Sequence, residues 1–313
     1  MTDSILLTGG FGNIGGRFAS FLSERKRSHI KLGTRTNRLA PLWSPSAEVV
    51  TCSLEDQDSL LKACDGVRTI FHFAALNDRE CANDPERAHQ VNVIGTENLL
   101  KAAHDRGVRH VIYMSTIHVY GSPLVGTFNE SSPTNPTHPY GLTHLRAEQV
   151  LHEWSTRIHS TIIRSSNGFG FPMSSDVNIW HVIVNDLCRQ AVRDRRLTLK
   201  SPSNSQRNFI TLEDICRALH HVAERVPLND ESIVFNLGSL RSRTLREMAE
   251  LVAERTYVTL GYRPDIIECQ DPISGETDLN FDSSKIRRTG YETTEQFTNE
   301  IDGIFDLVVS AND

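Results

Sequence analysis

An apolar run that ends in three spaced glycines is the feature that most constrains this chain. Residues 5–8 have strand character, glycines follow at positions 9, 12 and 15, and residues 17–24 have a helical pattern. In a dinucleotide site one glycine makes the tight turn, one lets the backbone approach a pyrophosphate, and one lets the helix pack close to the strand. The helix N-terminus offers free N–H groups to the phosphates. The alternative is a glycine-rich loop that opens some other α/β protein. The predicted loop contacts are Gly9, Phe11, Gly12, Asn13, Ile14 and Gly15.

Strand and helix patterns alternate through the first half of the chain. Predicted strands are 29–35, 49–52, 69–75, 110–115 and 161–164, and predicted helices are 56–64, 85–104 and 140–156. Such βα units predict an α/β fold with a doubly wound parallel (Rossmann) sheet.

The rhythm changes after residue 165. Loops are predicted at 121–139, 167–175 and 201–208. Helices are predicted at 179–192 and 245–255, a strand followed by a helix across 208–222, and a strand at 233–238. The tail that follows is weakly patterned. We expect a cofactor domain of residues 1–167 plus about 209–238. A smaller, discontinuous substrate domain would comprise about 168–208 plus 239–313.

Composition excludes several classes of protein. The 313 residues carry a formal net charge of −6, which argues against a nucleic-acid partner. No apolar run approaches the roughly 18 residues of a membrane helix, and residues 1–4 lead into the first strand without a signal peptide. Six cysteines lie scattered without a CxxC pair, as expected of reduced thiols. We predict a cytoplasmic protein with no membrane association and no metal site.

A hydroxyl pair and a tyrosine could carry chemistry. Ser115 and Thr116 follow a predicted parallel strand, whose C-terminal end borders the ligand crevice of such sheets. Tyr140 begins a predicted helix, and His144 lies one turn further on the same helix face. Tyrosine can serve as a general acid or base if a nearby cation lowers its pKa from about 10. Taken alone, Tyr140 could instead be a packing aromatic and His144 a surface histidine.

Together with the glycine loop, these motifs resemble the extended short-chain dehydrogenase/reductase family, and within it the nucleotide-sugar epimerases, dehydratases and reductases. Residues 8–15 match its TGGxGxIG loop, 71–75 its HLAA strand and 91–96 its VNxxGT helix. Residues 115–121 match SSxxVYG, and 139–141 match the catalytic PYG. Residues 207–210 with Asp214 are similar to RDFIxVxD, and 235–238 to YNLG.

The resemblance implies a role for each matching position. Tyr140 would exchange a proton with a sugar hydroxyl or ketone, Thr116 would hydrogen-bond the same oxygen, and the nicotinamide would take or give the hydride. Asn167 and Arg207 would hold the substrate diphosphate, for which the arginine fork is suited; a surface ion pair is the alternative for Arg207. The family often forms homodimers, so we expect one here. Further implied cofactor contacts are Ser53, Leu54, Ala74, Ala75, Asn92 and His144.

Two departures separate this chain from the family pattern. The YxxxK motif ends here in His144 instead of the lysine that binds the ribose and lowers the tyrosine pKa. A histidine can donate to a ribose hydroxyl, but a pKa of about 6.5 makes its charge partial and pH-dependent. Tyr140 would then be less acidic or active only with the imidazolium form of His144, or hydride chemistry would be lost altogether. Ile117 and His118 replace the Asp-Glu pair of the dehydratases, so we do not expect a 4,6-dehydratase. His118 is either an alternative acid/base at the substrate or a structural histidine.

The end of the second strand bears on the choice of cofactor. NAD enzymes usually place a carboxylate there, whereas an arginine accommodates a 2′-phosphate. The chain has Arg35, with Arg38 nearby, and Arg17 could add a further cation. We therefore predict NADP in preference to NAD.

The predicted function is an NAD(P)-dependent oxidoreductase acting on a nucleotide-diphosphate sugar, as a ketosugar reductase or an epimerase. One alternative is a non-catalytic dinucleotide-binding sensor or scaffold that has lost the family lysine. An oxidoreductase of a non-sugar alcohol is a third, weaker possibility, because Asn167 and Arg207 match diphosphate-contacting positions.

Overall fold

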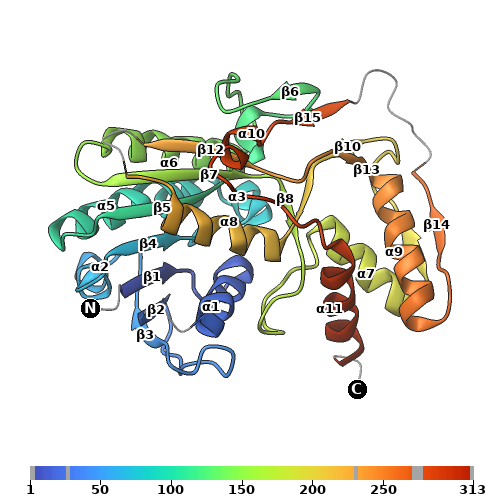
Figure 1. Cartoon of the computed structure of the whole chain (residues 1–313), viewed down its shortest axis with the longest axis horizontal. Helices are drawn as coiled ribbons and strands as arrows, with labels where there is room; N and C mark the ends of the chain where they lie inside the picture. The colour runs from blue at the N-terminus through green and yellow to red at the C-terminus, as the bar shows by residue number, and fades with distance from the viewer. Residues whose placement is uncertain (1–3, 26–28, 229–231, 270–277, 311–313) are drawn as a thin grey trace.

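A seven-stranded parallel sheet forms the larger part of the molecule in a computed structural model that describes residues 4–25, 29–228, 232–269 and 278–310. Its strand order is β12-β7-β5-β4-β1-β2-β3, and every neighbouring pair is parallel (Figure 1). The order reverses beside β1, which creates the switch point where such sheets bind ligands. The strands are β1 (Ser4–Thr8), β2 (His29–Thr34), β3 (Glu48–Thr51), β4 (Thr69–His72), β5 (His110–Thr116), β7 (His159–Ser165) and β12 (Ile233–Leu237).

Helices cover both faces of this sheet, so the predicted doubly wound fold is confirmed. On one face α1 (Asn13–Arg25) packs against α8 (Leu212–Arg225), and their apolar side chains share a core with β1 and β2. On the other face α2 (Gln57–Cys64), α5 (Gly95–Asp105) and α6 (Pro139–Glu153) pack side by side. The short helices α3 (Asp78–Asn83) and α4 (Pro85–His89) precede α5.

A second hydrophobic core lies to one side of the sheet. It is enclosed by α7 (Ile183–Asp194), α9 (Leu245–Leu260) and α11 (Phe297–Ser310), which Figure 1 shows gathered together. Strand β9 (Arg196–Thr198) pairs with β14 (Asp265–Ile267) beside these helices, and β10 (Gln206–Arg207) pairs with β13 (Arg243–Thr244). This core contains segments from both parts of the predicted substrate domain. Ile286 and Tyr291 instead pack in the core between the sheet and α8.

The structure differs from the predicted elements in several places, and the tail predicted to be weakly patterned contains α11. Residues 85–104 form two helices joined by a π-helical turn, Gln90–Ile94, instead of one continuous helix. The predicted loop at 167–175 begins with β8 (Asn167–Phe169), which pairs with β11 (Phe209–Thr211). The predicted loop at 121–139 contains β6 (Gly126–Phe128), paired with β15 (Leu279–Phe281) from the tail, and α10 (Ser284–Arg287) follows. Three-residue strands of this kind depend on a distant partner and have no local signal.

Among the described residues, no helix combines the length and the apolar character needed to cross a bilayer.

Candidate active site

The glycine loop joins β1 to α1 at the switch point of the sheet. Gly9 has φ = +64°, a left-handed conformation that favours glycine, and its carbonyl accepts the N–H of Gly12 at 2.9 Å. A Cβ on Gly15 would lie 2.3 Å from the Gly9 carbonyl oxygen, so α1 can approach the loop only because this residue lacks a side chain. The loop therefore has the tight turn and the close helix packing that a pyrophosphate site requires.

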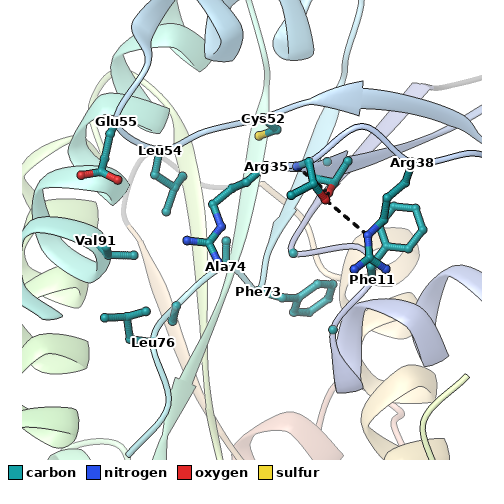
Figure 2. Close-up of a pocket in the computed structure, with 16 residues that line it drawn as sticks. Phe11, Arg35, Arg38, Cys52, Leu54, Glu55, Phe73, Ala74, Leu76 and Val91 are labelled. Carbon is teal, nitrogen blue, oxygen red and sulfur yellow. Dashed lines mark hydrogen bonds between the residues drawn. The ribbon is translucent and has the colours of Figure 1, made fainter. Parts of the chain in front are cut away.

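A cavity beside the loop lies at the ends of β2 and β4. Its described lining includes Gly9, Phe11 and Gly12 from the loop, Leu54 from the segment after β3, and Ala74 and Ala75 after β4. Figure 2 shows Arg35 reaching from the end of β2 toward Ala74, while Arg38 lies against Phe11. Arg38 also donates to the Thr36 hydroxyl at 3.4 Å. Ser53 is not among the described lining residues; its backbone N–H donates to Ser59.

Two charged residues with a possible bearing on cofactor binding, Glu55 and Arg17, are engaged by protein partners. Glu55 lines the cavity but is paired with Arg87, whose Nη2 lies 2.5 Å from a Glu55 carboxylate oxygen. Arg17, a possible cofactor cation on sequence grounds, is buried and pairs with Glu300 of α11 at 2.9 Å. The suggestion that Arg17 contacts the cofactor is therefore wrong, because its guanidinium joins two helices.

A second cavity brings Tyr140, Thr116 and His144 together with the glycine loop. Thr116 ends β5, and Tyr140 lies in the first turn of α6 after Pro139. The Thr116 hydroxyl oxygen accepts the His118 N–H at 3.3 Å, so its proton is available for the hydrogen bond with Tyr140. The two cavities share lining residues, Gly9 and Gly12 among them, so they lie next to each other at the loop.

Buried charges fix α6 against the sheet. Glu148 of α6 accepts from Arg164 of β7 at 2.7 Å and from the Ser115 hydroxyl of β5 at 2.5 Å. All three side chains are buried. Ser115 therefore supports the helix that carries Tyr140, and Thr116 is the hydroxyl that faces the tyrosine.

Burial moves the pKa of both candidate acid/base groups away from neutrality. Burial raises the pKa of Tyr140 to about 12, opposed by the hydrogen bond with Thr116. Burial lowers the pKa of His144 to about 3, and the neighbouring His72 and His118 act in the same direction. His144 is thus a neutral imidazole at pH 7. The partial positive charge that its sequence position suggested is absent, and it does not acidify Tyr140.

A buried chain of polar groups links the loop to α6. Thr8 Oγ1 accepts the N–H groups of Phe73 and Ala74, so its proton goes to His72 Nδ1 at 2.7 Å. The neutral His72 then donates from Nε2 to Thr96 at 3.0 Å. The nearby Asn92, in the π-helical turn, accepts from Leu76 N–H and donates to Thr143. Asn92 was predicted to contact the cofactor; its amide is occupied in positioning the segment after β4 and the first turns of α6.

None of the three predicted substrate residues is among the described lining residues of the cavity that contains Tyr140, although Asn167 lies in sequence between two of them, Ser166 and Gly168. Asn167 begins β8 and donates from Nδ2 to the Asn208 carbonyl at 2.8 Å. Arg207 of β10 has a buried Nε with no partner in the described part of the chain. His118 lies in the 3-10 helix Ile117–Tyr120 with its ring centroid 6.0 Å from that of Tyr140. Burial and the Arg207 cation lower the pKa of His118.

Sequence analysis missed several lining residues. Ser166 lines the cavity that contains Tyr140, and its hydroxyl is buried without a described partner. Its place directly after β7, at the carboxyl edge of the sheet, could have identified it. Asn178 and His181 line the same cavity from a segment before α7, and no motif pointed to them.

Comparison with known proteins identifies the family. Residues 5–238 match the model of the NAD dependent epimerase/dehydratase family. The chain belongs to this family. A UDP-glucose 4-epimerase from Streptomyces lividans is 27% identical over 279 residues, which is 82% of each chain.

Solved epimerase structures share the fold over nearly the whole chain. A UDP-N-acetylglucosamine 4-epimerase from Methanobrevibacter ruminantium, in complex with UDP-N-acetylmuramic acid, has a TM-score of 0.85 at 19% identity and covers 99% of this chain and 100% of its own. A UDP-glucose 4-epimerase from Thermus thermophilus, in complex with NAD, has a TM-score of 0.80 at 20% identity, with 98% and 99% covered. These structures confirm the predicted fold, and the family match confirms the predicted resemblance to an NAD dependent family.

The residues of this epimerase/dehydratase family member fit such a cofactor. Asn13 Oδ1, His144 Nε2 and Ser166 Oγ are buried polar atoms without a described partner, and all three residues line the cavity that contains Tyr140. Buried polar groups are rarely left unpaired unless a ligand or water satisfies them. Together with the glycine cradle, they form a site with unmet hydrogen bonds beside Tyr140.

Proposed function

We propose that the chain is an NAD(P)-dependent enzyme that oxidises and reduces a carbon of a nucleotide-diphosphate sugar, with Tyr140 as its acid/base. The observation that carries this proposal is the placement of Tyr140 and its hydrogen-bonded partner Thr116 in one cavity with the dinucleotide-binding loop. A nicotinamide bound there supplies the acceptor and donor of a hydride at the sugar carbon.

Tyr140 and Thr116 divide the proton chemistry. Tyr140 holds the proton that leaves or returns to the sugar oxygen, and Thr116 keeps that phenol in place by donating to it. The Thr116 oxygen is itself held by the His118 N–H. Removal of the tyrosine hydroxyl therefore eliminates the proton carrier while leaving the cavity walls intact. Loss of turnover on removal of this hydroxyl would also distinguish an enzyme from a non-catalytic sensor. The named relatives are epimerases and do not favour the sensor.

Arg207 and Asn167 are proposed to hold the substrate diphosphate. Arg207 has a buried nitrogen without a described partner, and its pKa is lowered by burial, so an anion beside it would restore the lost solvation. Asn167 pairs with Phe209 of β11 and donates to the Asn208 carbonyl, so it lies close to the segment that carries Arg207. The relatives named as UDP-sugar 4-epimerases, one of them in complex with a UDP-sugar, support this substrate class.

Epimerisation of the sugar carbon is the first candidate outcome, because the named relatives are 4-epimerases. Net reduction of a ketosugar is the second, and a specific observation favours it. Arg35 and Arg38 line the cavity at the end of β2, and its lining carboxylate, Glu55, is paired with Arg87. A cationic edge of this kind suits the 2′-phosphate of NADP, the usual cofactor of net reduction.

Incubation with a panel of UDP- and dTDP-sugars tests the proposal directly. Products are followed by proton NMR of the anomeric signals, while absorbance at 340 nm reports net consumption of NADH or NADPH. Epimerisation gives a new anomeric signal without net absorbance change, and reduction of a keto sugar consumes NADPH. Absence of turnover with every keto and hydroxy sugar, in a protein that binds dinucleotide, would overturn the proposal.

A further inference from the structure

His144 has one ring nitrogen with a protein partner and one without. Nδ1 lies 2.7 Å from the hydroxyl oxygen of Tyr113 on β5. Nε2 is buried and has no hydrogen-bond partner in the described part of the chain. The imidazole is 3% exposed and lines the cavity that contains Tyr140 and the glycine loop. The unpaired nitrogen therefore belongs to the proposed cofactor site.

The position of the imidazole proton follows from counting donors and acceptors. A neutral histidine carries one N–H, and heavy-atom positions leave its location to the surrounding hydrogen bonds. If Nδ1 held the proton, the buried Tyr113 O–H would have no described acceptor, and Nε2 would present a bare lone pair. If Tyr113 donates to Nδ1, the phenol is satisfied and only Nε2–H is left without a partner. The second arrangement leaves fewer unsatisfied buried groups.

The surroundings keep both groups uncharged. Burial raises the pKa of the Tyr113 phenol well above its usual value, and the charge of Glu148 acts in the same direction. His144 is faced by His72 from β4, His118 from the 3-10 helix, and the ring of Tyr140 on its own helix, with centroids 4.5 Å apart. None of these neighbours supplies a carboxylate that would stabilise an imidazolium.

We propose that Tyr113 is a positioning residue that donates to Nδ1 of His144, fixes the proton on Nε2, and so presents a neutral N–H donor to a ribose hydroxyl of the bound dinucleotide. This inference rests on the proposed function of the cavity. The family lysine has two tasks, a hydrogen bond to the ribose and a positive charge that lowers the tyrosine pKa. In this proposal His144 retains the hydrogen bond to the cofactor and lacks the positive charge. Tyr113 thereby determines how the site binds a dinucleotide without lysine.

Nitrogen NMR of the ligand-free protein tests the tautomer. Histidine labelled with ¹⁵N gives distinct long-range ¹H–¹⁵N patterns for the two neutral tautomers, and the His144→Gln variant identifies the His144 signals among the 13 histidines. We expect a protonated Nε2 and a bare Nδ1 at pH 7 in the wild-type protein. A protonated Nδ1 would overturn the inference. This measurement needs no ligand and is independent of whether the proposed reaction occurs.

Variants at two buried tyrosines then separate positioning from general packing. Tyr113→Phe should shift His144 toward a mixture of tautomers and weaken dinucleotide binding about threefold to tenfold, the worth of one hydrogen bond. Tyr120→Phe is the matched control, since it also removes a buried hydroxyl, bonded to Asn236 at 2.7 Å and Arg164 at 3.0 Å. It should leave the His144 signals and the dinucleotide affinity unchanged. Equal effects of the two variants would overturn the positioning role.

Titration with NADP⁺ and NAD⁺ completes the test. Saturation of the wild-type protein should shift the His144 Nε2 resonance, because a new acceptor reaches its proton. An unchanged resonance in the saturated protein would overturn the donor role. Failure of both dinucleotides to bind would contradict the proposed function and the donor role, while the apo tautomer would still decide the role of Tyr113.

Discussion

At the scale of single residues, Tyr140 and His144 lie one helical turn apart, and both are neutral at pH 7. Burial raises the pKa of the phenol to about 12 and lowers that of the imidazole to about 3. Asp78 and Cys81 of α3 raise the tyrosine pKa further. The deprotonated tyrosine that must accept a proton from a sugar hydroxyl is therefore scarce at pH 7 and becomes more abundant as the pH rises.

The oxidation rate should consequently rise with pH. A base with a pKa of about 12 gains deprotonated form about tenfold per pH unit below that value, so log kcat for sugar oxidation should climb with a slope near 1 between pH 7 and 10. His144→Lys places an ammonium beside the phenol, lowers the tyrosine pKa and should move the inflection to lower pH. His144→Gln is the neutral control and should keep the alkaline profile. Identical pH profiles of the two variants would contradict this electrostatic account.

Arg35 should contribute to selection of the phosphorylated cofactor. Its guanidinium has no hydrogen bond or ion pair within the described residues, and it reaches across the cavity at the end of β2. Arg35→Ala should weaken NADP⁺ binding by about 1.5–3 kcal/mol, the worth of a hydrogen bond to a charged group. Binding of NAD⁺, which lacks the 2′-phosphate, should change little. Calorimetry with both dinucleotides measures the difference, and an equal loss for both would exclude a 2′-phosphate contact.

At the scale of elements, the start of α1 depends on the absence of one side chain. A Cβ on Gly15 would overlap the Gly9 carbonyl oxygen, whereas a Cβ on the adjacent Gly16 would meet its nearest neighbour, Met173, at 3.7 Å. Gly15→Ala should therefore displace the loop, cost about 1–3 kcal/mol of stability and abolish tight dinucleotide binding. Gly16→Ala should gain about 0.5–1 kcal/mol from helix propensity and retain binding. Urea unfolding and dinucleotide titration compare them, and similar behaviour would contradict the packing argument.

Elements with strong local patterns could be predicted, and those that depend on distant partners could not. The strands of the sheet could be predicted because both faces are covered, which makes their sequences nearly continuously apolar, as in residues 70–73, where only His72 is polar. Strands β6 and β15 have three residues each and form only because they pair with each other across about half of the chain. Helix α11 lies in the tail for which no helix is predicted, although Ile301, Ile304 and Phe305 form a buried stripe.

At the scale of the whole molecule, a buried ion pair connects the sheet region to the second core. Arg17 of α1 bonds Glu300 of α11 at 2.9 Å and the carbonyl of Phe171 at 3.2 Å. Glu300 also accepts the backbone N–H of Glu213 at 3.0 Å. The pair therefore ties together segments from four parts of the chain.

Removal of one partner should be costly because it leaves the other charge buried. Arg17→Ala should lower the free energy of unfolding in urea by about 3–5 kcal/mol. Arg263→Ala is the control, since this arginine also pairs with two carboxylates, Glu250 and Glu254, but lies at the surface. Its removal should change stability little. Equal destabilisation by both variants would show that the buried pair has no special role.

Much of the site could be predicted because its motifs are contiguous in sequence. The glycine loop, Thr116 and Tyr140 each belong to a short motif and line one cavity, and the family match confirms the predicted class of protein. The neutral state of His144 could not be predicted, since it arises from burial beside His72 and His118 of other elements. NADP preference, the roles of Asn167 and Arg207, the homodimer and the cytoplasmic location stay predictions.

Turnover of a nucleotide sugar by wild-type protein and the Tyr140→Phe variant, in the same NMR assay, tests the central claim most directly. The variant keeps the ring in its place against His144 and loses only the hydroxyl that bonds Thr116. If Tyr140 is the acid/base, conversion by the variant should fall by at least about a hundredfold, since general acid–base catalysis contributes about 10²–10⁴-fold. The affinity of the variant for the dinucleotide should be retained. Conversion by Tyr140→Phe at the wild-type rate would contradict the account.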